Sequence, residues 1–103
     1  MEKFTEKVIQ IIKSIPEGKI MTYGQIARIA GNPRAARQVV RILHSMSDRY
    51  QLPWHRVINA KGEIAVKDGE ANFAQRKFLE AEGVETGSDN RIDVECYRFH
   101  PEV

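Results

Sequence analysis

The segment that follows a Gly-Asn-Pro turn at residues 31–33 restricts the possible folds of this chain more than any other feature. Apolar residues recur in it at the i, i+3, i+4, i+7 spacing of a helix with one buried side, namely Ala36, Val39, Val40, Leu43 and Met46. The other side of the same helix would carry Arg34, Arg37, Gln38 and Arg41. Such a helix needs neighbouring elements to cover its apolar side, and it leaves a basic side in solvent.

A shorter helix is predicted just before this one. Thr22 lies three residues before Gln25, which is the spacing of a capping box. Gly31 suits the left-handed position after the shorter helix, and Asn32 with Pro33 is typical of an N-cap and first helical residue of the longer helix. Two helices joined by so tight a turn, the second with a basic outer side, indicate a helix-turn-helix. An ordinary helical hairpin with a solvated surface is the alternative.

Two more helices are predicted on either side of this pair. Periodic apolar residues indicate a first helix over Thr5–Ser14 and a fourth over Phe73–Ala81. We expect Asn72 to cap the fourth helix and Gly83 to end it.

The sheet content is predicted to be small. Residues 57–59 and 64–66 indicate a short β hairpin with the shape of a wing, and residues 92–96 alternate like a last strand. Residues 52–56 are too rich in proline and aromatics for a helix. The predicted fold class is mainly α (α+β): a single winged helix-turn-helix domain with a short β hairpin, over residues 1–103.

The charge is uneven along the chain. Residues 19–61 contain eight Lys and Arg against one acid, Asp48, which gives +7. The remaining eight cations and thirteen carboxylates give −5, so that the total is +2. A middle segment this basic favours a surface that binds a polyanion such as nucleic acid, although a merely solvated surface has the same count.

Composition restricts the other function classes. No apolar run approaches the roughly 18 residues of a membrane span, and the charged start of the chain lacks a signal-peptide core, so we expect a cytoplasmic protein with no membrane partner. Cys96 is the only cysteine, and the three histidines share no metal-ligand spacing with it. We therefore expect no disulfide, no metal and no cofactor.

Several motifs occur together in one order along the chain. They are Ile15-Pro16-Glu17-Gly18, Thr22-Tyr23-Gly24-Gln25, Ala30-Gly31-Asn32-Pro33, Ala35-Ala36-Arg37, Pro53-Trp54-His55-Arg56-Val57 and Glu82-Gly83. With these motifs, residues 4–84 resemble the DNA-binding domain of the O6-alkylguanine-DNA alkyltransferases. That family has Pro-Cys-His-Arg-Val where this chain has Trp54, and the family's cysteine accepts the alkyl group.

Trp54 at the cysteine position predicts a protein without transfer chemistry. Alkyl transfer needs a thiolate that attacks the alkyl carbon, and an indole has no comparable nucleophile. The tryptophan pattern is similar to the alkyltransferase-like proteins, which bind the lesion and present it to nucleotide excision repair. The resemblance implies that His55 and Glu82 are a remnant of the relay that polarises the family's cysteine.

The resemblance also implies roles for residues that could contact DNA. Arg37 matches the arginine finger that fills the space of the flipped guanine, and Tyr23 matches the tyrosine that helps to rotate the 3′ phosphate. Small residues that allow approach to the minor groove are matched by Ala35 and Ala36. The other expected DNA-contacting residues are Thr22, Arg34, Gln38 and Arg41. We expect the lesion pocket to be formed by Trp54, Val57 and the Asp68–Asn72 loop.

This chain departs from the family pattern at a few positions. Gln38 and Val40 are larger than the family's residues in the recognition helix, which affects how deeply that helix can insert. Ser45-Met46 stands where the family has an asparagine hinge. Gln75 stands where the family has a lysine near the pocket, and Lys67–Glu70 lacks the family's Tyr-Ser-Gly run.

The function predicted from the sequence is binding of O6-alkylguanine in duplex DNA through the minor groove by a monomer. The base would be flipped and flagged for nucleotide excision repair proteins without alkyl transfer. Two alternatives remain open: an active alkyltransferase that uses Cys96, and a winged-helix transcriptional regulator that reads the major groove.

Overall fold

The computed structural model describes residues 1–64 and 68–101. Its elements in chain order are α1 (Lys3–Ser14), β1 (Met21–Thr22), α2 (Tyr23–Ile29), α3 (Ala36–Tyr50), the 3₁₀ helix η1 (Trp54–Arg56), β2 (Val57–Ile58), α4 (Gly69–Ala81) and α5 (Val94–Tyr97). The predicted mainly helical class is confirmed. None of the helices in the described ranges is long and apolar enough to cross a membrane.

The first two helices form where their sequence patterns place them. Val8 and Ile12 of α1 are fully buried, as the predicted apolar stripe requires. The capping box of α2 is complete: the Gln25 amide N–H donates to Thr22 Oγ1 (3.1 Å), and the Thr22 amide N–H donates to Gln25 Oε1 (3.4 Å). Gly31 has a φ of 106°, which confirms the predicted left-handed end of α2.

Helix α3 begins later than predicted. Asn32 is not its N-cap, because the Asn32 side chain accepts from the Arg34 N–H (3.1 Å) and the Asn32 carbonyl accepts from the Ala35 N–H (3.0 Å). These two bonds close a separate turn over residues 32–35, and the helix starts only at Ala36. The predicted helix-turn-helix is present as α2 and α3, which pack against one another.

The buried side of α3 is also shifted from the predicted stripe. Val39 and Leu43 are buried as expected, but the third buried residue of α3 is Ile42. Ala36, Val40 and Met46 are only half-buried. The shift follows from packing, because α3 contacts both α1 and α2 and therefore buries a side that faces two neighbours.

The predicted β hairpin is wrong within the described residues. β2 pairs in parallel with β1, in the register Met21 with Val57 and Thr22 with Ile58. The chain after the turn at residues 59–62 pairs with the C-terminal segment instead: the Ile64 N–H donates to the Asn90 carbonyl (3.0 Å), and the Ile92 N–H donates to the Gly62 carbonyl (2.8 Å). Residues 65–66 of the predicted hairpin lie outside the described residues.

Gly62 explains why the chain turns toward the C-terminal segment. Its φ is 78°, and a Cβ atom at this position would lie 2.5 Å from the Ile92 carbonyl oxygen. Only glycine permits both the backbone conformation and this close approach. The pairing brings Ile64 beside Ile92, and both side chains are buried.

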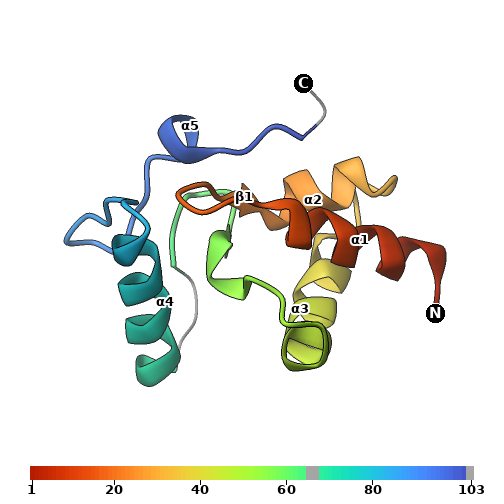
Figure 1. Ribbon diagram of the computed structural model, residues 1–103. Coiled ribbons are helices and arrows are strands. Elements are labelled where there is room, and N and C mark those ends of the chain that lie inside the picture. Colours follow the sequence, from red (N-terminus) through yellow and green to blue (C-terminus); the bar gives the residue numbers. More distant parts are fainter. Residues whose placement is uncertain (65–67, 102–103) are drawn as a thin grey trace.

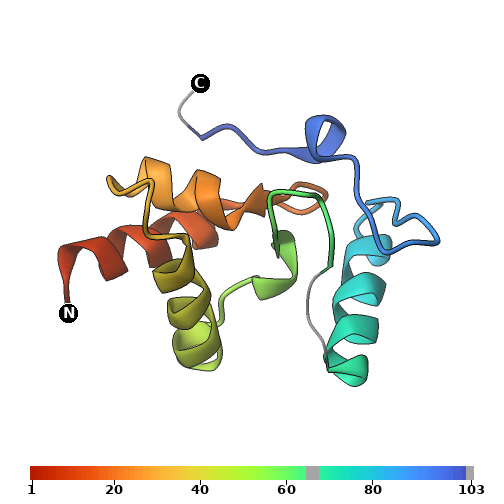
Figure 2. The ribbon, with the colours of Figure 1, turned by 180° about the vertical axis from the view of Figure 1, so that it is seen from behind.

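Two apolar clusters hold the molecule together. The larger one is formed by α1, α2 and α3 with Leu52 and Val57. The smaller one consists of Ile20, Ile58, Ile64, Leu79, Val84 and Ile92. Figures 1 and 2 show the corresponding arrangement, with α1–α3 on one side, α4 on the other, and η1 between them. The segment that contains Trp54 is therefore held between two packed units.

Two predictions for the C-terminal third need correction. Helix α4 starts at Gly69 rather than at Phe73, because the Asp68 carboxylate caps it by accepting from the Glu70 N–H (2.9 Å). The expected last strand is absent from the described residues of that segment: Asp93 accepts from the Cys96 N–H (3.2 Å) and starts the one-turn helix α5. In both cases an aspartate cap favours a helix over the alternative.

Residues 52–56 also differ from the prediction. They do not lack helical structure altogether, because Trp54–Arg56 form one turn of 3₁₀ helix. Its end is followed directly by β2, so the turn changes the direction of the chain between α3 and the sheet. Gly83, by contrast, ends α4 as predicted, with a φ of 88°.

Candidate nucleic-acid interface

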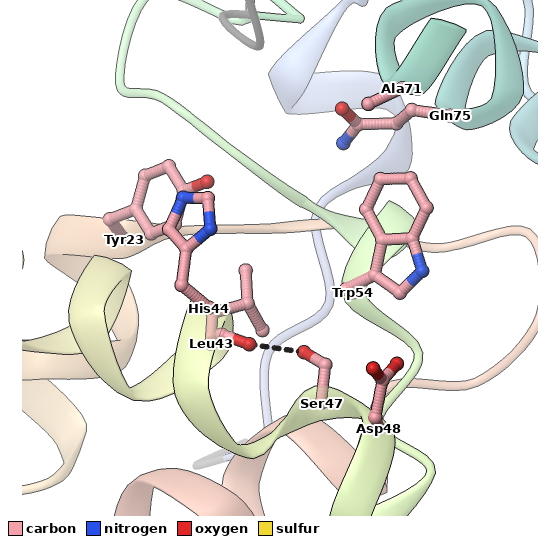
Figure 3. Close-up of a pocket in the computed structure, with 8 residues that line it drawn as sticks. All are labelled: Tyr23, Leu43, His44, Ser47, Asp48, Trp54, Ala71 and Gln75. Carbon is pink, nitrogen blue, oxygen red and sulfur yellow. Dashed lines mark hydrogen bonds between the residues drawn. The ribbon is translucent and has the colours of Figure 1, made fainter. Parts of the chain in front are cut away.

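A pocket of about 230 Å³ opens between α3, η1 and α4. Its lining comes from four elements and consists of Tyr23, Leu43, His44, Ser47, Asp48, Trp54, Ala71 and Gln75 (Figure 3). The volume far exceeds the roughly 30 Å³ share of one water and falls below the about 300 Å³ typical of drug-sized ligands. A pocket of this size suits a single group smaller than a drug-sized ligand.

Trp54, an expected lesion-binding residue, forms one wall of this pocket. The half-buried indole is presented by η1 and stands opposite Tyr23 in Figure 3. Its ring meets Phe78 edge-on at 6.3 Å between centroids and His55 at the same centroid distance. These contacts fix the indole, and its apolar ring lines the pocket.

Tyr23 forms the facing wall from the first residue of α2. Burial raises the pKa of its hydroxyl above the usual value of 10.0, so the group stays protonated at physiological pH. A protonated phenol can donate a hydrogen bond. The predicted site residues Trp54 and Tyr23 lie 31 positions apart in sequence and are brought to one pocket by η1 and α2.

The third wall is the C-terminal half of α3, whose residues were not among those expected in the site. His44 and Asp48 line the pocket and are exposed. They continue one stripe of α3 that begins with Arg37 and Arg41, at spacings of four, three and four residues. The helical spacing of these four residues is visible in the sequence, so it could have predicted that the pocket wall and the basic side of α3 form one continuous surface.

The basic side of α3 is exposed as predicted. Arg34, Arg37 and Arg41 are exposed, Gln38 is half-buried, and Ala36 is half-buried at the helix start. Cations elsewhere in residues 19–61 are exposed too, namely Lys19, Arg28, Arg49 and Lys61. Arg56 differs from these seven, because it is half-buried and binds Glu82.

Three predicted site residues have side chains that face the interior. Thr22 is 4% exposed, and its hydroxyl is already used in the α2 cap. Ala35 packs in the larger cluster. Val57 is 1% exposed and does not line the pocket, because it belongs to β2 beneath it. The Asp68–Asn72 segment contributes Ala71, but as the first turn of α4 rather than as a loop.

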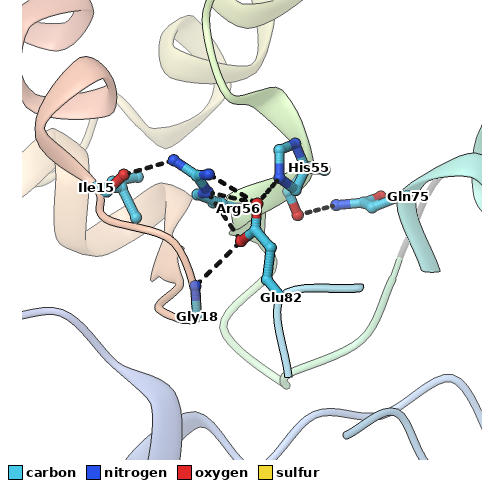
Figure 4. A network of polar contacts seen from close by, with 6 residues as sticks. All are labelled: Ile15, Gly18, His55, Arg56, Gln75 and Glu82. Atoms are coloured by element: carbon cyan, nitrogen blue, oxygen red, sulfur yellow. Dashed lines mark hydrogen bonds and ion pairs between the residues drawn. The ribbon is translucent and has the colours of Figure 1, made fainter. Parts of the chain in front are cut away.

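Glu82 is the centre of a polar network behind the pocket (Figure 4). Its carboxylate contacts His55 Nε2 at 2.7 Å and Arg56 Nη2 at 2.7 Å. It also accepts from the Gly18 N–H at 3.1 Å, and Arg56 Nη1 donates to the Ile15 carbonyl at 2.8 Å. The predicted contact between His55 and Glu82 is confirmed, and the network joins the 15–18 turn, η1 and the end of α4.

The protonation of Glu82 follows from these contacts. Burial by itself raises the pKa of this carboxyl, but hydrogen bonds from Arg56, His55 and Gly18 outweigh that effect and lower the pKa from 4.5 to about 2. Glu82 is therefore ionised at physiological pH. An ionised partner orients the His55 ring, which stands beside Trp54 and has no thiol to activate there.

Gln75 lies deeper in the site than any other polar lining residue. It is 2% exposed. Its Nε2 donates to the carbonyls of His55 and Val57, both at 3.1 Å. Gln75 therefore connects α4 to the 3₁₀ turn that presents Trp54. The presence of glutamine at this position in the sequence did not predict that role.

The lining of the pocket contains no cysteine among the residues that the structure describes. Cys96 is exposed in α5. The chemistry that the pocket itself offers is contact with aromatic rings, hydrogen bonding and charge.

A helix-turn-helix whose exposed basic helix continues into a base-sized pocket defines a DNA-binding domain. Over residues 3–84, the chain matches the family described as 6-O-methylguanine DNA methyltransferase, DNA binding domain. It is 42% identical over 99 residues to the DNA base-flipping protein of Escherichia coli (strain K12), a match covering 96% of this chain and 76% of that protein. The chain belongs to this family, as one of its alkyltransferase-like members.

Two further comparisons agree with this assignment. The chain is 44% identical over 86 residues to alkyltransferase-like protein 1 of Schizosaccharomyces pombe, covering 82% of this chain and 80% of that protein. The crystal structure of S. pombe Atl1 in complex with damaged DNA containing O6-carboxymethylguanine matches the fold with a TM-score of 0.85, at 38% identity and over 98% of both chains.

Proposed function

We propose that this protein binds O6-alkylguanine in duplex DNA from the minor groove and holds the flipped base in the pocket without removing its alkyl group. The observation that carries the proposal is Trp54 as a wall of the pocket, beside a His55–Glu82 pair that has no thiol to activate. The indole offers a flat apolar surface to a base or its alkyl substituent, and it offers no nucleophile for transfer.

Arg37 supports the base-flipping part of the proposal. It is exposed on the stripe of α3 that leads to the pocket wall at His44 and Asp48. A long planar guanidinium at this place can fill the gap left by an extrahelical base and pair with the orphaned partner. The half-buried Ala36 beside it leaves room for the helix start to approach the duplex.

Selection for damage has a physical basis in the flipping step. Unstacking and unpairing a base costs a few kcal/mol, and the cost is least for a damaged base that already pairs poorly. A lesion therefore reaches the pocket at a smaller cost than normal guanine. The bound, non-reactive complex would then flag the site for nucleotide excision repair proteins, with a single copy of the chain on the duplex.

The experiment is a binding titration with one duplex that either contains or lacks a single O6-methylguanine. We expect tighter binding to the lesion duplex. After incubation the lesion should remain intact and the mass of the protein unchanged. Equal affinity for the two duplexes would overturn the proposal, and a mass gain of one methylene unit would show transfer instead.

A Trp54→Cys variant is the matched control for the chemistry. It places a thiol beside His55 and tests whether the remaining relay can still support transfer. Gain of a methyl group by this variant, but not by the wild-type protein, would assign the lack of chemistry to Trp54 alone.

A further inference from the structure

Half of the Gln75 amide is without a partner at the pocket. Nε2 donates to two carbonyl oxygens, those of His55 and Val57. Oε1 is buried and has no hydrogen-bond partner within the described part of the chain. Figure 3 shows this amide extending from α4 toward the pocket, above the ring of Trp54. A buried polar atom left unpaired costs free energy and is unusual in a folded protein, so it calls for a ligand or another functional explanation.

The contacts of Nε2 fix which end of the amide is unpaired. Turning the amide over would place Oε1 against the carbonyl oxygens of His55 and Val57 and would break both hydrogen bonds. The side chain is 2% exposed, so solvent cannot compensate for that loss. Gln75 therefore presents an acceptor to the site, and the group that completes it must be a donor.

We propose that Gln75 Oε1 accepts a hydrogen bond from the exocyclic 2-amino group of the base held in the pocket. The inference rests on the proposed function, in which O6-alkylguanine is that base. Alkylation at O6 leaves N1 without a proton, so the 2-amino group provides the only N–H donors on the edges of the lesion. An acceptor in the wall of the pocket thus selects purines with a 2-amino group.

This contact makes recognition of the guanine skeleton independent of the alkyl group. Adenine carries its amino group at position 6 instead, and the 2-amino group of guanine is untouched by the size of the O6 substituent. Gln75 would therefore distinguish guanine from adenine lesions through the 2-amino group, whereas Trp54 contacts the base face or the substituent. Discrimination against undamaged guanine is left to the cost of flipping.

The test compares O6-methylguanine with O6-methylhypoxanthine, the same lesion without its 2-amino group, at one position of one duplex. Wild-type protein should bind the O6-methylhypoxanthine duplex about five- to tenfold more weakly, the size expected for one neutral hydrogen bond. Loss of the amino group also weakens pairing in the free duplex. That effect is common to all protein variants and cancels in a double-mutant cycle.

Two variants of Gln75 distinguish a hydrogen bond to the base from a role in positioning the 3₁₀ turn η1. Gln75→Lys keeps a donor for the two carbonyl oxygens but has no acceptor. Gln75→Met removes both functions at a similar side-chain length. For each variant the ratio of the two affinities should fall about five- to tenfold below the wild-type ratio, because only the effect of the amino group on pairing then remains. The matched control is Gln10→Met, an exposed glutamine on α1, which should keep the wild-type ratio.

The outcomes are distinguishable. If wild-type protein prefers O6-methylguanine to guanine but the ratio of the two lesion affinities is the same in wild type and Gln75→Met, the role of Gln75 is wrong and the proposed function stands. The inference is also overturned if Gln75→Lys keeps the wild-type ratio of the two lesion affinities. It is overturned as well if a variant loses the same affinity for both lesions, so that their ratio is unchanged. If the wild-type protein shows no preference for lesion over guanine, both proposals fail. Gln75→Lys keeps a donor to the two carbonyl oxygens, so the test stays open even if Gln75→Met fails to fold.

Discussion

Arg37 and Arg41 occupy one stripe of α3 but lie at different distances along it from the pocket wall at His44. If Arg37 stabilises the extrahelical state, Arg37→Ala should weaken binding to lesion DNA far more than binding to normal DNA, because an undamaged duplex stays stacked. Arg41→Ala, which would remove one phosphate contact, should weaken both equally. Fluorescence titrations with 2-aminopurine beside the lesion would report affinity and unstacking together. Equal losses for Arg37→Ala on both duplexes would contradict the arginine-finger role.

Trp54 carries a different contribution, because it faces the pocket and has no charge. Trp54→Ala should reduce the preference for the alkylated base by roughly 1–3 kcal/mol, the value of one aromatic contact with a base. The dependence of affinity on salt should stay as in the wild-type protein. Titration of both duplexes at two salt concentrations measures the two quantities. Phe78→Ala is a useful comparison, since Phe78 supports the indole but does not line the pocket.

At the scale of elements, the Glu82 network determines where η1 stands. One carboxylate joins the 15–18 turn, η1 and the end of α4 through Gly18, His55 and Arg56. The 3₁₀ turn that presents Trp54 is thereby held from behind, and Gln75 holds it from α4. The position of the indole depends on these long-range contacts more than on the turn itself, whose three residues are only half-buried.

This arrangement predicts a pH-dependent stability. The pKa of Glu82 is lower in the folded protein (about 2) than its ordinary value of 4.5. Its contribution, roughly 3 kcal/mol, is therefore complete above pH 4.5 and is lost as the pH falls from 4.5 toward 2. Glu82→Gln should lower the free energy of unfolding at pH 7, and the difference from wild type should shrink at acid pH. Chemical denaturation at several pH values measures this difference.

The control for this prediction is Glu80→Gln, which changes an exposed carboxylate on the same helix. Its ion pair with Arg76 is long and partly solvated, so the change should alter stability little at any pH. A Glu82→Gln variant that behaves like this control would show that the network does not contribute to stability.

At the scale of the whole molecule, the distribution of charge predicts how DNA affinity depends on salt. Residues 19–61 contain seven exposed cations and one acid, Asp48, which lines the pocket. The logarithm of affinity should fall linearly with the logarithm of salt, with a slope no steeper than about −6 if each exposed cation meets at most one phosphate. Affinities for normal duplex from 50 to 200 mM salt would measure the slope. An affinity independent of salt would contradict DNA binding by this surface.

Features that depend on neighbouring residues could be predicted from the sequence. The α2 cap needs only Thr22 and Gln25, three residues apart, and the apolar stripe of α1 follows from helical periodicity. The replacement of the family's cysteine by Trp54 is visible in the sequence without any coordinates. These features depend on neighbours within one turn of helix or on the identity of one residue, so the pattern was sufficient to predict them.

Features that depend on distant residues follow from the packing of the folded chain and could not be predicted from the sequence. Val57 was expected in the pocket, but parallel pairing with Met21 places it in the core, and no local pattern encodes that partner. Asp48 lines the pocket because α3 continues past its basic face to meet η1. The free acceptor of Gln75 exists only because α4 packs against the carbonyls of His55 and Val57. Each of these three features depends on which segments of the chain pack together. That packing is set by burial and hydrogen bonding over the whole molecule, and the spacing of residues along the sequence does not specify it.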